Sequence, residues 1–259
     1  MLNRFRLKNT EHKEEVKMNA ANTLKKLGIE QTFNYIYKDP DKNMNKMMDW
    51  ADKFSQGQFS SQRKMIREAI ENPKHPYYPN IRKLFKDVDP HVTKTLAVNF
   101  FINAALTGWP KEEKLRQKYN CNIPWAILLD PTSACNLHCT GCWAAEYGHK
   151  LNLTYDEIDD IICQGKELGV YMYIYTGGEP LVRKKDLIKL CEKHSDCVFL
   201  CFTNATLIDE DFANEMLRVG NLVPAISLEG FEEATDDRRG NGVYQKVIHA
   251  MELLRKKKL

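Results

Sequence analysis

Hydrophobic and polar positions follow two different patterns along the chain, and the change between them falls near residue 120. Up to that point apolar residues recur every three or four positions, the spacing of amphipathic helices, with polar and proline-containing breaks between them. Beyond it, short continuous apolar runs alternate with helix-period stretches, which is typical of a parallel sheet with helices on its outside. The pattern predicts a helical N-terminal region over residues 1–120 and an α/β region over residues 121–259.

The α/β region contains four successive strand–helix units. Apolar, β-branched and aromatic runs predict strands over 125–129, 170–176, 198–202 and 222–228. A helix is expected after each strand, the first opened by a capping box at Thr154–Glu157 and ended at Gly169. Connections of this kind are right-handed and leave the strands parallel. The carboxyl ends of all four strands should therefore meet at one edge of the sheet.

Four apolar stripes predict helices in the N-terminal region. They comprise Val16, Ala20, Leu24 and Leu27; Met44, Met47, Met48, Ala51 and Phe54; Met65, Ile66, Ala69 and Ile70; and the run Val92–Leu106, which Gly108–Pro110 is expected to end. The methionines favour core packing, although a methionine surface also suits varied ligands. The last run favours a buried helix, with a membrane-surface helix or a lipid-sized pocket as the alternative. A lid or docking platform is our hypothesis for this region.

Composition narrows the class of protein. The 259 residues are 43% hydrophobic and 28% charged, which allows a core and is ordinary for a soluble chain. A net charge of +3, with no basic–aromatic stripe, gives no support for a nucleic-acid partner. No secretory signal is visible, and the longest apolar stretch, Thr95–Trp109, is too short to span a bilayer. The eight cysteines do not form a disulfide scaffold, so we expect reduced thiols and a cytoplasmic protein without a transmembrane segment.

Three cysteines lie close together just after the first expected strand. Cys135, Cys139 and Cys142 are separated by three and by two residues, so three thiolates can converge from one loop. Soft metals and iron–sulfur clusters take such ligands. A closed zinc site or an ordinary electron-transfer cluster has four protein ligands, whereas three leave one metal position open for chemistry. A structural zinc site that borrows Cys121 or Cys163 as its fourth ligand is the alternative.

Four further motifs follow the expected strands. They are Gly177–Pro180 after the second strand, Thr203–Leu207 after the third, Ile226–Gly230 at the end of the fourth, and Asp236–Gly240 beyond it. In parallel α/β sheets the loops at the carboxyl ends of the strands build the ligand site. All five motifs fall at that edge, which favours an enzyme.

In these five motifs and in their order, the sequence resembles the radical S-adenosylmethionine (radical SAM) enzymes. The resemblance covers residues 124–256 and is greatest to the branch that matures peptides and proteins or builds cofactors. It implies an α/β fold with a partial (β/α)6 TIM-like barrel. A barrel core of this family typically has six βα units and about four are visible here, so the core over 121–259 is expected to be truncated at its C-terminus.

The resemblance also implies the chemistry. A [4Fe-4S] cluster and S-adenosylmethionine are the expected cofactors, and a flavodoxin or ferredoxin is the expected reductant. Reductive cleavage of S-adenosylmethionine would give a 5′-deoxyadenosyl radical that abstracts hydrogen from a peptide, protein or cofactor-precursor substrate. The alternatives are the same cofactor chemistry on a lipid or small molecule, and a non-enzymatic zinc- or cluster-binding interaction module.

Single residues receive roles from the same resemblance. Those implied to hold the cluster are Cys135, Cys139 and Cys142; those implied to bind S-adenosylmethionine are Gly177, Gly178, Glu179, Pro180, Asn204, Ser227 and Arg239. The glycine turn would meet the methionine amino group, with Glu179 adding negative charge. Ser227 would contact a ribose hydroxyl, and Arg239 the methionine carboxylate.

Some of these roles have competing interpretations. Arg238 competes with Arg239, and an ion pair with Asp236 or Asp237 is the alternative for either arginine. Asn204 fits a turn as well as it fits a ligand. The residue after it, Ala205, stands where glycine is commoner in the family, which leaves the local backbone open.

Overall fold

The computed structural model describes residues 27–28, 31–54, 57, 60–144, 148 and 150–259. The helix expected from Val16 lies outside these residues except at its end, Leu27. The chain divides into two compact units, Met1–Lys86 and Asp87–Leu259, and each is described by itself. A separate role for residues 1–120 stays a prediction.

The first unit is helical. It contains residues 31–38 and the helices α2 (Pro40–Phe54), α3 (Ser60–Glu71) and α4 (Tyr78–Asp87). Met44 and Met48 are buried, which confirms core packing for these two methionines; the side chains of Met47, Ala51 and Phe54 lie outside the described part. The stripe that begins at Met65 is partly wrong. Met65 is 67% exposed, and the residues of α3 that are buried are Ala69 and Ile70.

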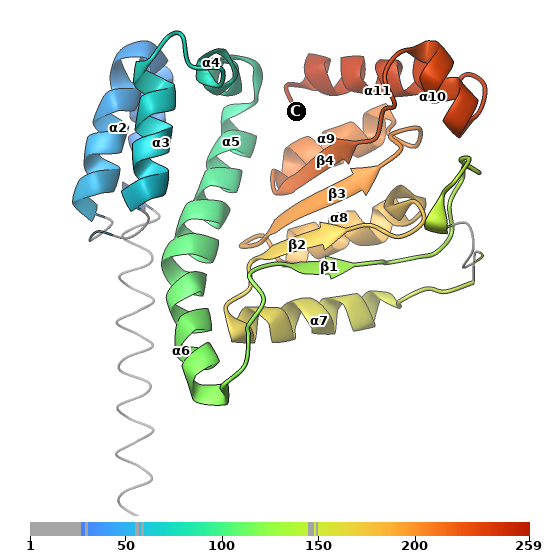
Figure 1. Cartoon of the computed structure of the whole chain (residues 1–259), viewed down its shortest axis with the longest axis horizontal. Helices are drawn as coiled ribbons and strands as arrows, with labels where there is room; N and C mark the ends of the chain where they lie inside the picture. Colours follow the sequence, from blue (N-terminus) through green and yellow to red (C-terminus); the bar gives the residue numbers. More distant parts are fainter. Residues whose placement is uncertain (1–26, 29–30, 55–56, 58–59, 145–147, 149) are drawn as a thin grey trace, which may run out of the picture. The chain divides into compact units, whose positions relative to one another are not determined.

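The second unit is built on a four-stranded parallel sheet of order β1-β2-β3-β4. The strands are β1 (Ile127–Leu129), β2 (Met172–Tyr175), β3 (Val198–Thr203) and β4 (Leu222–Ile226). The helices that follow them are α7 (Tyr155–Leu168), α8 (Lys184–Lys193, preceded by the 3₁₀ turn η3, Pro180–Arg183), α9 (Glu210–Val219), α10 (Glu232–Arg239) and α11 (Val243–Lys257). Figure 1 shows α7, α8, α9 and α11 along one side of the sheet. This is the predicted partial barrel of four βα units.

The helix-facing side of the sheet holds the core. Tyr173, Tyr175, Phe199 and Cys201 alternate along β2 and β3 and are at most 1% exposed. The Tyr175 and Phe199 rings stack with their centroids 5.4 Å apart. The start of the first of these helices, α7, is also as predicted, since Thr154 and Glu157 form a reciprocal capping box.

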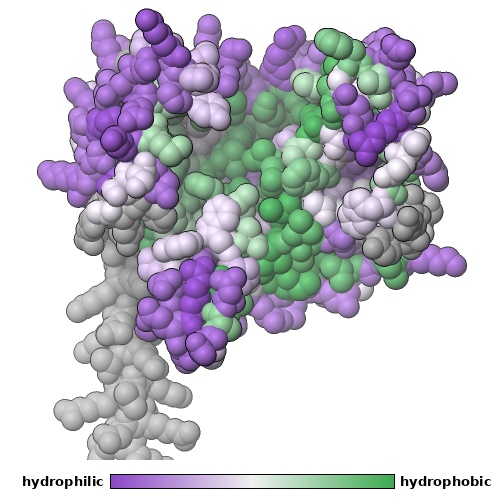
Figure 2. All heavy atoms as spheres, viewed as in Figure 1, coloured by the Kyte–Doolittle hydropathy of each residue, from purple (hydrophilic) through white to green (hydrophobic). Residues whose placement is uncertain are grey.

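The opposite side of the sheet is apolar and partly open to solvent. Leu128 pairs in register with Ile174, and Ile174 with Leu200, so these side chains share one face. Leu128 is 59% exposed, and Phe202, further along the same face, is 47% exposed. Figure 2 shows apolar side chains gathered over the strands. The interior face of the partial barrel is therefore an accessible hydrophobic surface.

A long helix crosses the amino ends of the strands. It consists of α5 (Pro90–Ala97), the π-helix η1 (Val98–Gly108) and α6 (Trp109–Tyr119) in succession. Asn99 Nδ2 donates to Ser195 O at 2.8 Å, and Asn103 Nδ2 donates to Asp196 O at 2.8 Å. These bonds satisfy carbonyls of the α8–β3 turn. They support the buried-helix interpretation of this run.

The expected end of that helix at Gly108–Pro110 is wrong, because the chain continues helically to Tyr119. Pro110 lies in the first turn of α6, where a missing N–H costs no α-helical hydrogen bond. None of the helices among the described residues is both long and apolar enough to cross a membrane.

Glu112 gives the second unit a pH-dependent stability. Its side chain is 1% exposed, and its Oε2 accepts a hydrogen bond from Arg116 Nη2 at 3.2 Å. Burial raises the pKa of Glu112 to about 7, an effect that the positive charge of Arg116 only partly offsets. The folded protein therefore binds more protons than the unfolded chain between the ordinary glutamate pKa and about 7. Its stability falls as the pH rises through this window.

Glu112→Gln should remove this dependence, since the amide keeps an oxygen for Arg116 but carries no charge. Near pH 8 we expect the variant to exceed the parent in unfolding free energy by about 2 kcal/mol, after allowance for solvent screening. Urea unfolding of both proteins at about pH 5 and pH 8 measures the difference. Equal pH dependence in the two proteins would contradict the assignment.

Candidate functional site

The cysteine loop, residues 134–144, leaves the end of β1 and is closed at its base. Thr132 forms an antiparallel bridge with Asn152, on the return of the chain toward α7. Arg183 Nη1 donates hydrogen bonds to carbonyl oxygens on both sides of this bridge, to Pro131 O at 2.9 Å and to Leu153 O. The base of the loop is thus fixed to the start of the second βα unit.

The glycine turn after β2 touches this base backbone to backbone. The Gly178 N–H donates to Thr132 O at 2.9 Å. A Cβ at Gly178 would lie 2.5 Å from Ser133 O, and one at Gly177 would lie 2.6 Å from Thr132 O. Gly177 also has a φ of 103°, in the left-handed region. Only glycine allows the two segments to approach so closely.

Glu179 joins three loops. Its N–H donates to Ala134 O at 2.8 Å. Its carboxylate accepts hydrogen bonds from Leu181 N at 2.9 Å, Thr203 Oγ1 at 2.8 Å and Asn204 N at 2.7 Å. The residue is 1% exposed. Burial raises the pKa of Glu179, and the hydrogen bonds, that of the Asn204 N–H first, oppose this rise.

The three cysteines of the loop are each half-buried, and Cys135 lies near enough to Glu179 to be affected by its charge. The Leu137 N–H contacts Cys135 Sγ at 3.4 Å, and Cys142 N donates to Cys139 O at 3.2 Å. Burial raises the pKa of Cys135; the Leu137 N–H lowers it, and negative charge on Glu179, Cys139 and Cys142 raises it further. The thiols are therefore close enough to act on one another electrostatically.

The three thiols of the loop are not gathered tightly around one point. Thiolate sulfurs around one tetrahedral zinc ion lie roughly 4 Å apart, because the Zn–S bond is longer than Zn–N or Zn–O bonds. Among the described residues, three donor atoms within 4.8 Å of one another occur at Asp159, Cys163 and His194, and not at the cysteine loop. A cluster accepts the wider spacing because each thiolate binds a different iron. Cys163, suggested above as a fourth zinc ligand, belongs to that other group.

Asn204 forms a turn and also lies near the cysteine loop, so it has features of both roles that the sequence allowed. Its Oδ1 accepts hydrogen bonds from Thr206 N at 3.0 Å and Thr206 Oγ1 at 2.7 Å, which is a turn. Its Nδ2 donates to Asn136 Oδ1 at 3.0 Å and lies 3.9 Å from Cys135 Sγ. The following Ala205 has a φ of 61°, so it adopts the glycine-like conformation despite its side chain. A direct ligand role for Asn204 stays a prediction.

Arg238 and Arg239 both bind Glu229. Arg239 contacts Glu229 Oε1 through Nε at 3.0 Å and Nη2 at 2.5 Å, and Arg238 Nη1 contacts Oε2 at 2.8 Å. These bonds, first that of Arg239, hold the pKa of Glu229 below its usual value. The alternative of an ion pair holds in kind but with Glu229 as the partner; the Asp236 carboxylate accepts hydrogen bonds from Gly242 N and Tyr244 N around the start of α11.

The arginine pair lies beside the cysteine loop. Thr140 N donates to Arg238 O at 2.8 Å. Burial raises the pKa of Cys139, and the positive charge of Arg239 lowers it. Ser227 lies at the same edge, since its N–H donates to Thr203 O at 2.9 Å. The structure thus brings together segments that are as much as a hundred residues apart.

Sequence reasoning missed two contributors to this arrangement. Glu229 lies within the Ile226–Gly230 motif, so the motif pointed to the segment but not to the residue that binds both arginines. Arg183 carries no sequence signal, because a lone arginine after a turn is common on protein surfaces.

The comparisons with known proteins agree with this geometry. A sequence model of the radical SAM superfamily matches residues 129–259, just over half of the chain. A PqqA peptide cyclase from Bradyrhizobium diazoefficiens is 34% identical over 120 residues, which are 45% of this chain and 31% of that protein. An AdoMet-dependent heme synthase from Methanosarcina barkeri is 29% identical over 141 residues, 52% of this chain and 40% of that protein.

Among solved structures, native anSMEcpe with bound AdoMet and Cp18Cys peptide overlaps 51% of this chain and 40% of its own, with 26% identity and a TM-score of 0.44. The chain spans well under half the length of these curated relatives.

Gly178→Ala tests the close contact between the turn and the loop. The added methyl group must displace the backbone at Ser133 and Ala134, so we expect a loss of about 1–3 kcal/mol in unfolding free energy. The iron content after anaerobic reconstitution should fall together with the stability, because Cys135 directly follows Ala134. Gly28→Ala is the matched control. A Cβ added at Gly28 would meet no atom within 4 Å, so the effect should stay within about 0.5 kcal/mol. Equal effects of both substitutions would show that the contact is not required.

Proposed function

The chain belongs to the radical SAM superfamily, and on that premise we propose that it binds a [4Fe-4S] cluster and S-adenosylmethionine and cleaves the latter reductively to begin radical chemistry. The observation that carries the proposal is the meeting of the three half-buried thiols with the glycine turn, Asn204 and the arginine pair at one edge of the sheet.

The cluster ligands in this proposal are Cys135, Cys139 and Cys142. When bound, the cluster supplies one electron for cleavage of the sulfur–C5′ bond and one open iron position for the amino and carboxylate groups of S-adenosylmethionine. The chain contributes fixed geometry. The loop is fixed at its base by Thr132 and near its far end by the hydrogen bond from Thr140 to Arg238.

For the glycine turn we propose a backbone role. The polar backbone of Gly177–Pro180 would meet the amino group of the ligand. The Glu179 carboxylate already accepts three hydrogen bonds inside the protein. Its contribution is therefore to position the turn and the Asn204 backbone, and its buried charge adds a negative potential near the loop.

For the ligand carboxylate we propose Arg239. Two arginines face one glutamate, so the Arg238–Glu229–Arg239 group carries one excess positive charge next to Cys139. The side chain of Arg239 is 14% exposed and that of Arg238 47%, so solvent screens Arg239 less. Ser227, at the end of β4, would contact the ribose.

For the substrate we propose a peptide, protein or cofactor precursor. One relative is by name a peptide cyclase and another a heme synthase. The open apolar face at Leu128 and Phe202 runs toward the same edge as the cysteine loop, and it would hold an apolar part of the substrate. The alternative, a lipid or small molecule, rests on the apolar 96–106 helix, whose Asn99 and Asn103 bind the α8–β3 turn. A flavodoxin or ferredoxin stays the predicted reductant.

The cluster is tested with reconstituted protein under anaerobic conditions. We expect about four irons per chain, a reduced-state EPR signal that changes when S-adenosylmethionine is added, and release of 5′-deoxyadenosine. Replacing Cys135, Cys139 or Cys142 by Ala should abolish all three observations. Cys121→Ala is the control, because this exposed thiol follows α6 and has no role in the proposed site. One zinc per chain, with neither iron nor sulfide, would instead support the interaction-module alternative.

The arginine assignment is tested by a pair of conservative substitutions. Arg239→Lys should weaken S-adenosylmethionine binding by at least about tenfold, because lysine cannot reproduce the two-donor fork. Arg238→Lys, at the more exposed position, should change it less than about threefold. Equilibrium dialysis of the cluster-loaded variants measures both. A larger effect at Arg238 would reverse the assignment.

A further inference from the structure

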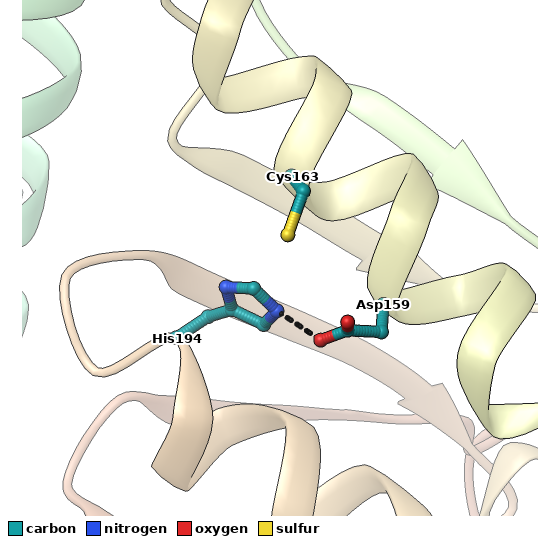
Figure 3. A group of neighbouring side chains, drawn as sticks. All are labelled: Asp159, Cys163 and His194. Atoms are coloured by element: carbon teal, nitrogen blue, oxygen red, sulfur yellow. Dashed lines mark hydrogen bonds and ion pairs between the residues drawn. The ribbon is translucent and has the colours of Figure 1, made fainter.

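A second group of metal-binding side chains lies in the helical layer. Asp159 and Cys163 are four residues apart on α7, so their side chains share one face of the helix. His194 follows the last residue of α8 and points toward both (Figure 3). The three donor atoms, a carboxylate oxygen, a thiol sulfur and an imidazole nitrogen, all lie within 4.8 Å of one another.

This group is separate from the cysteine loop. In a βα unit the helix runs back from the carboxyl end of one strand to the amino end of the next. Cys163 lies in the second half of α7, and His194 lies at the end of α8, just before β3. Both positions therefore belong to the amino end of the sheet, whereas the cysteine loop lies at the carboxyl end.

The histidine is held in place by its surroundings. His194 is 3% exposed. Its backbone N–H donates to Leu190 O at 2.8 Å, and its backbone carbonyl accepts a hydrogen bond from Asn221 Nδ2 at 3.2 Å. His194 Nε2 lies 2.9 Å from Asp159 Oδ1. Burial lowers the pKa of His194, although Asp159 opposes this, so the ring favours the neutral form that binds metal ions.

We propose that Asp159, Cys163 and His194 form a binding site for one divalent ion of the zinc type, with water as the fourth ligand. Thiolate, imidazole and carboxylate are the ligands that zinc takes in proteins. The hydrogen bond between His194 and Asp159 explains the position of these two residues but not that of Cys163. A thiol beside them completes a mixed set that magnesium or calcium would not prefer.

Small side-chain movements suffice to bring the donors together. Around a tetrahedral zinc ion they would lie roughly 3.5 Å apart, compared with the present limit of 4.8 Å. Asp159 and Cys163 stand on the same helix, and the exposed thiol is free to rotate about its Cα–Cβ bond. His194, the least mobile of the three, would define the position of the ion.

Two lysines face the group and set a limit on its affinity. Lys193 Nζ bonds Asp159 Oδ2 at 2.8 Å, but its side chain is 52% exposed and can turn into solvent when a cation binds. Lys166 acts on His194 as well, and its charge is balanced by Asp196 at 2.7 Å. Lys193 is therefore the one lysine of the two that has to move away from Asp159 when the ion binds. The bound ion would tie α7 to the end of α8, a structural link independent of the radical chemistry proposed above.

The experiment follows the reactivity of single thiols in the full chain with its cluster reconstituted. Zinc chloride is titrated, the protein is treated with iodoacetamide, and alkylation of each cysteine is measured by peptide mass spectrometry. Cys163 and Cys121 are both exposed, so Cys121 serves as the internal control. We expect micromolar zinc to protect Cys163 and to leave Cys121 reactive. Peptide-level detection keeps any zinc bound at the cysteine loop out of the result.

The variants identify the other two ligands. Asp159→Asn preserves size and should raise the zinc concentration needed for half-protection of Cys163 by at least about tenfold, and His194→Gln should do the same. Since His194 is buried, its variant is compared only if its circular dichroism and melting curve match those of the parent; Asp159→Asn does not depend on that result. Cobalt should also give a thiolate-to-metal charge-transfer band that Cys163→Ser removes. Equal protection of Cys163 and Cys121, or no change with Asp159→Asn, would overturn the proposal whether or not the cluster site is active.

Discussion

The arrangement of the site depends on the hydrogen bonds made by Glu179, whose carboxylate is buried. It accepts hydrogen bonds from the turn after β2 and from the end of β3, while its own N–H binds the loop after β1. A charge taken out of water is tolerated only where donors replace the lost hydration. Glu179 therefore holds three loops together. Separating the end of β3 would leave a buried negative charge with too few partners, and separating the cysteine loop would leave the Glu179 N–H without its acceptor.

The cysteine loop gains its geometry from contacts near both of its ends. At its base, Gly178 approaches Ser133 and Ala134 so closely that no side chain fits between them. Near the third cysteine, Thr140 donates to the backbone of Arg238. A short loop held in this way loses little further entropy when a ligand binds. The same contacts bring the excess positive charge of the arginine pair next to Cys139.

The two ends of the sheet have different physical roles. At the carboxyl end the loops are polar, partly exposed and rich in unusual backbone conformations, as at Gly177 and Ala205. At the amino end the turns are packed under the α5–η1–α6 helix, and Asn99 and Asn103 satisfy their carbonyls. Strain and exposed polar groups are thus concentrated at the end where we propose that ligands bind, and the amino end supplies rigidity. The Asp159, Cys163 and His194 group lies at this rigid end, which keeps its donor atoms in fixed positions.

The elements that could be predicted from the sequence are those whose signals are local. The capping box at Thr154 and the apolar strands each depend on neighbours within a few residues, and these predictions agree with the structure. The tertiary structure alone decided which partner each polar side chain takes. Glu229, rather than Asp236, binds the arginines, and Asn99 binds a turn almost a hundred residues away. Such pairings depend on how the chain folds back in space, and the spacing of residues along a sequence carries no record of that.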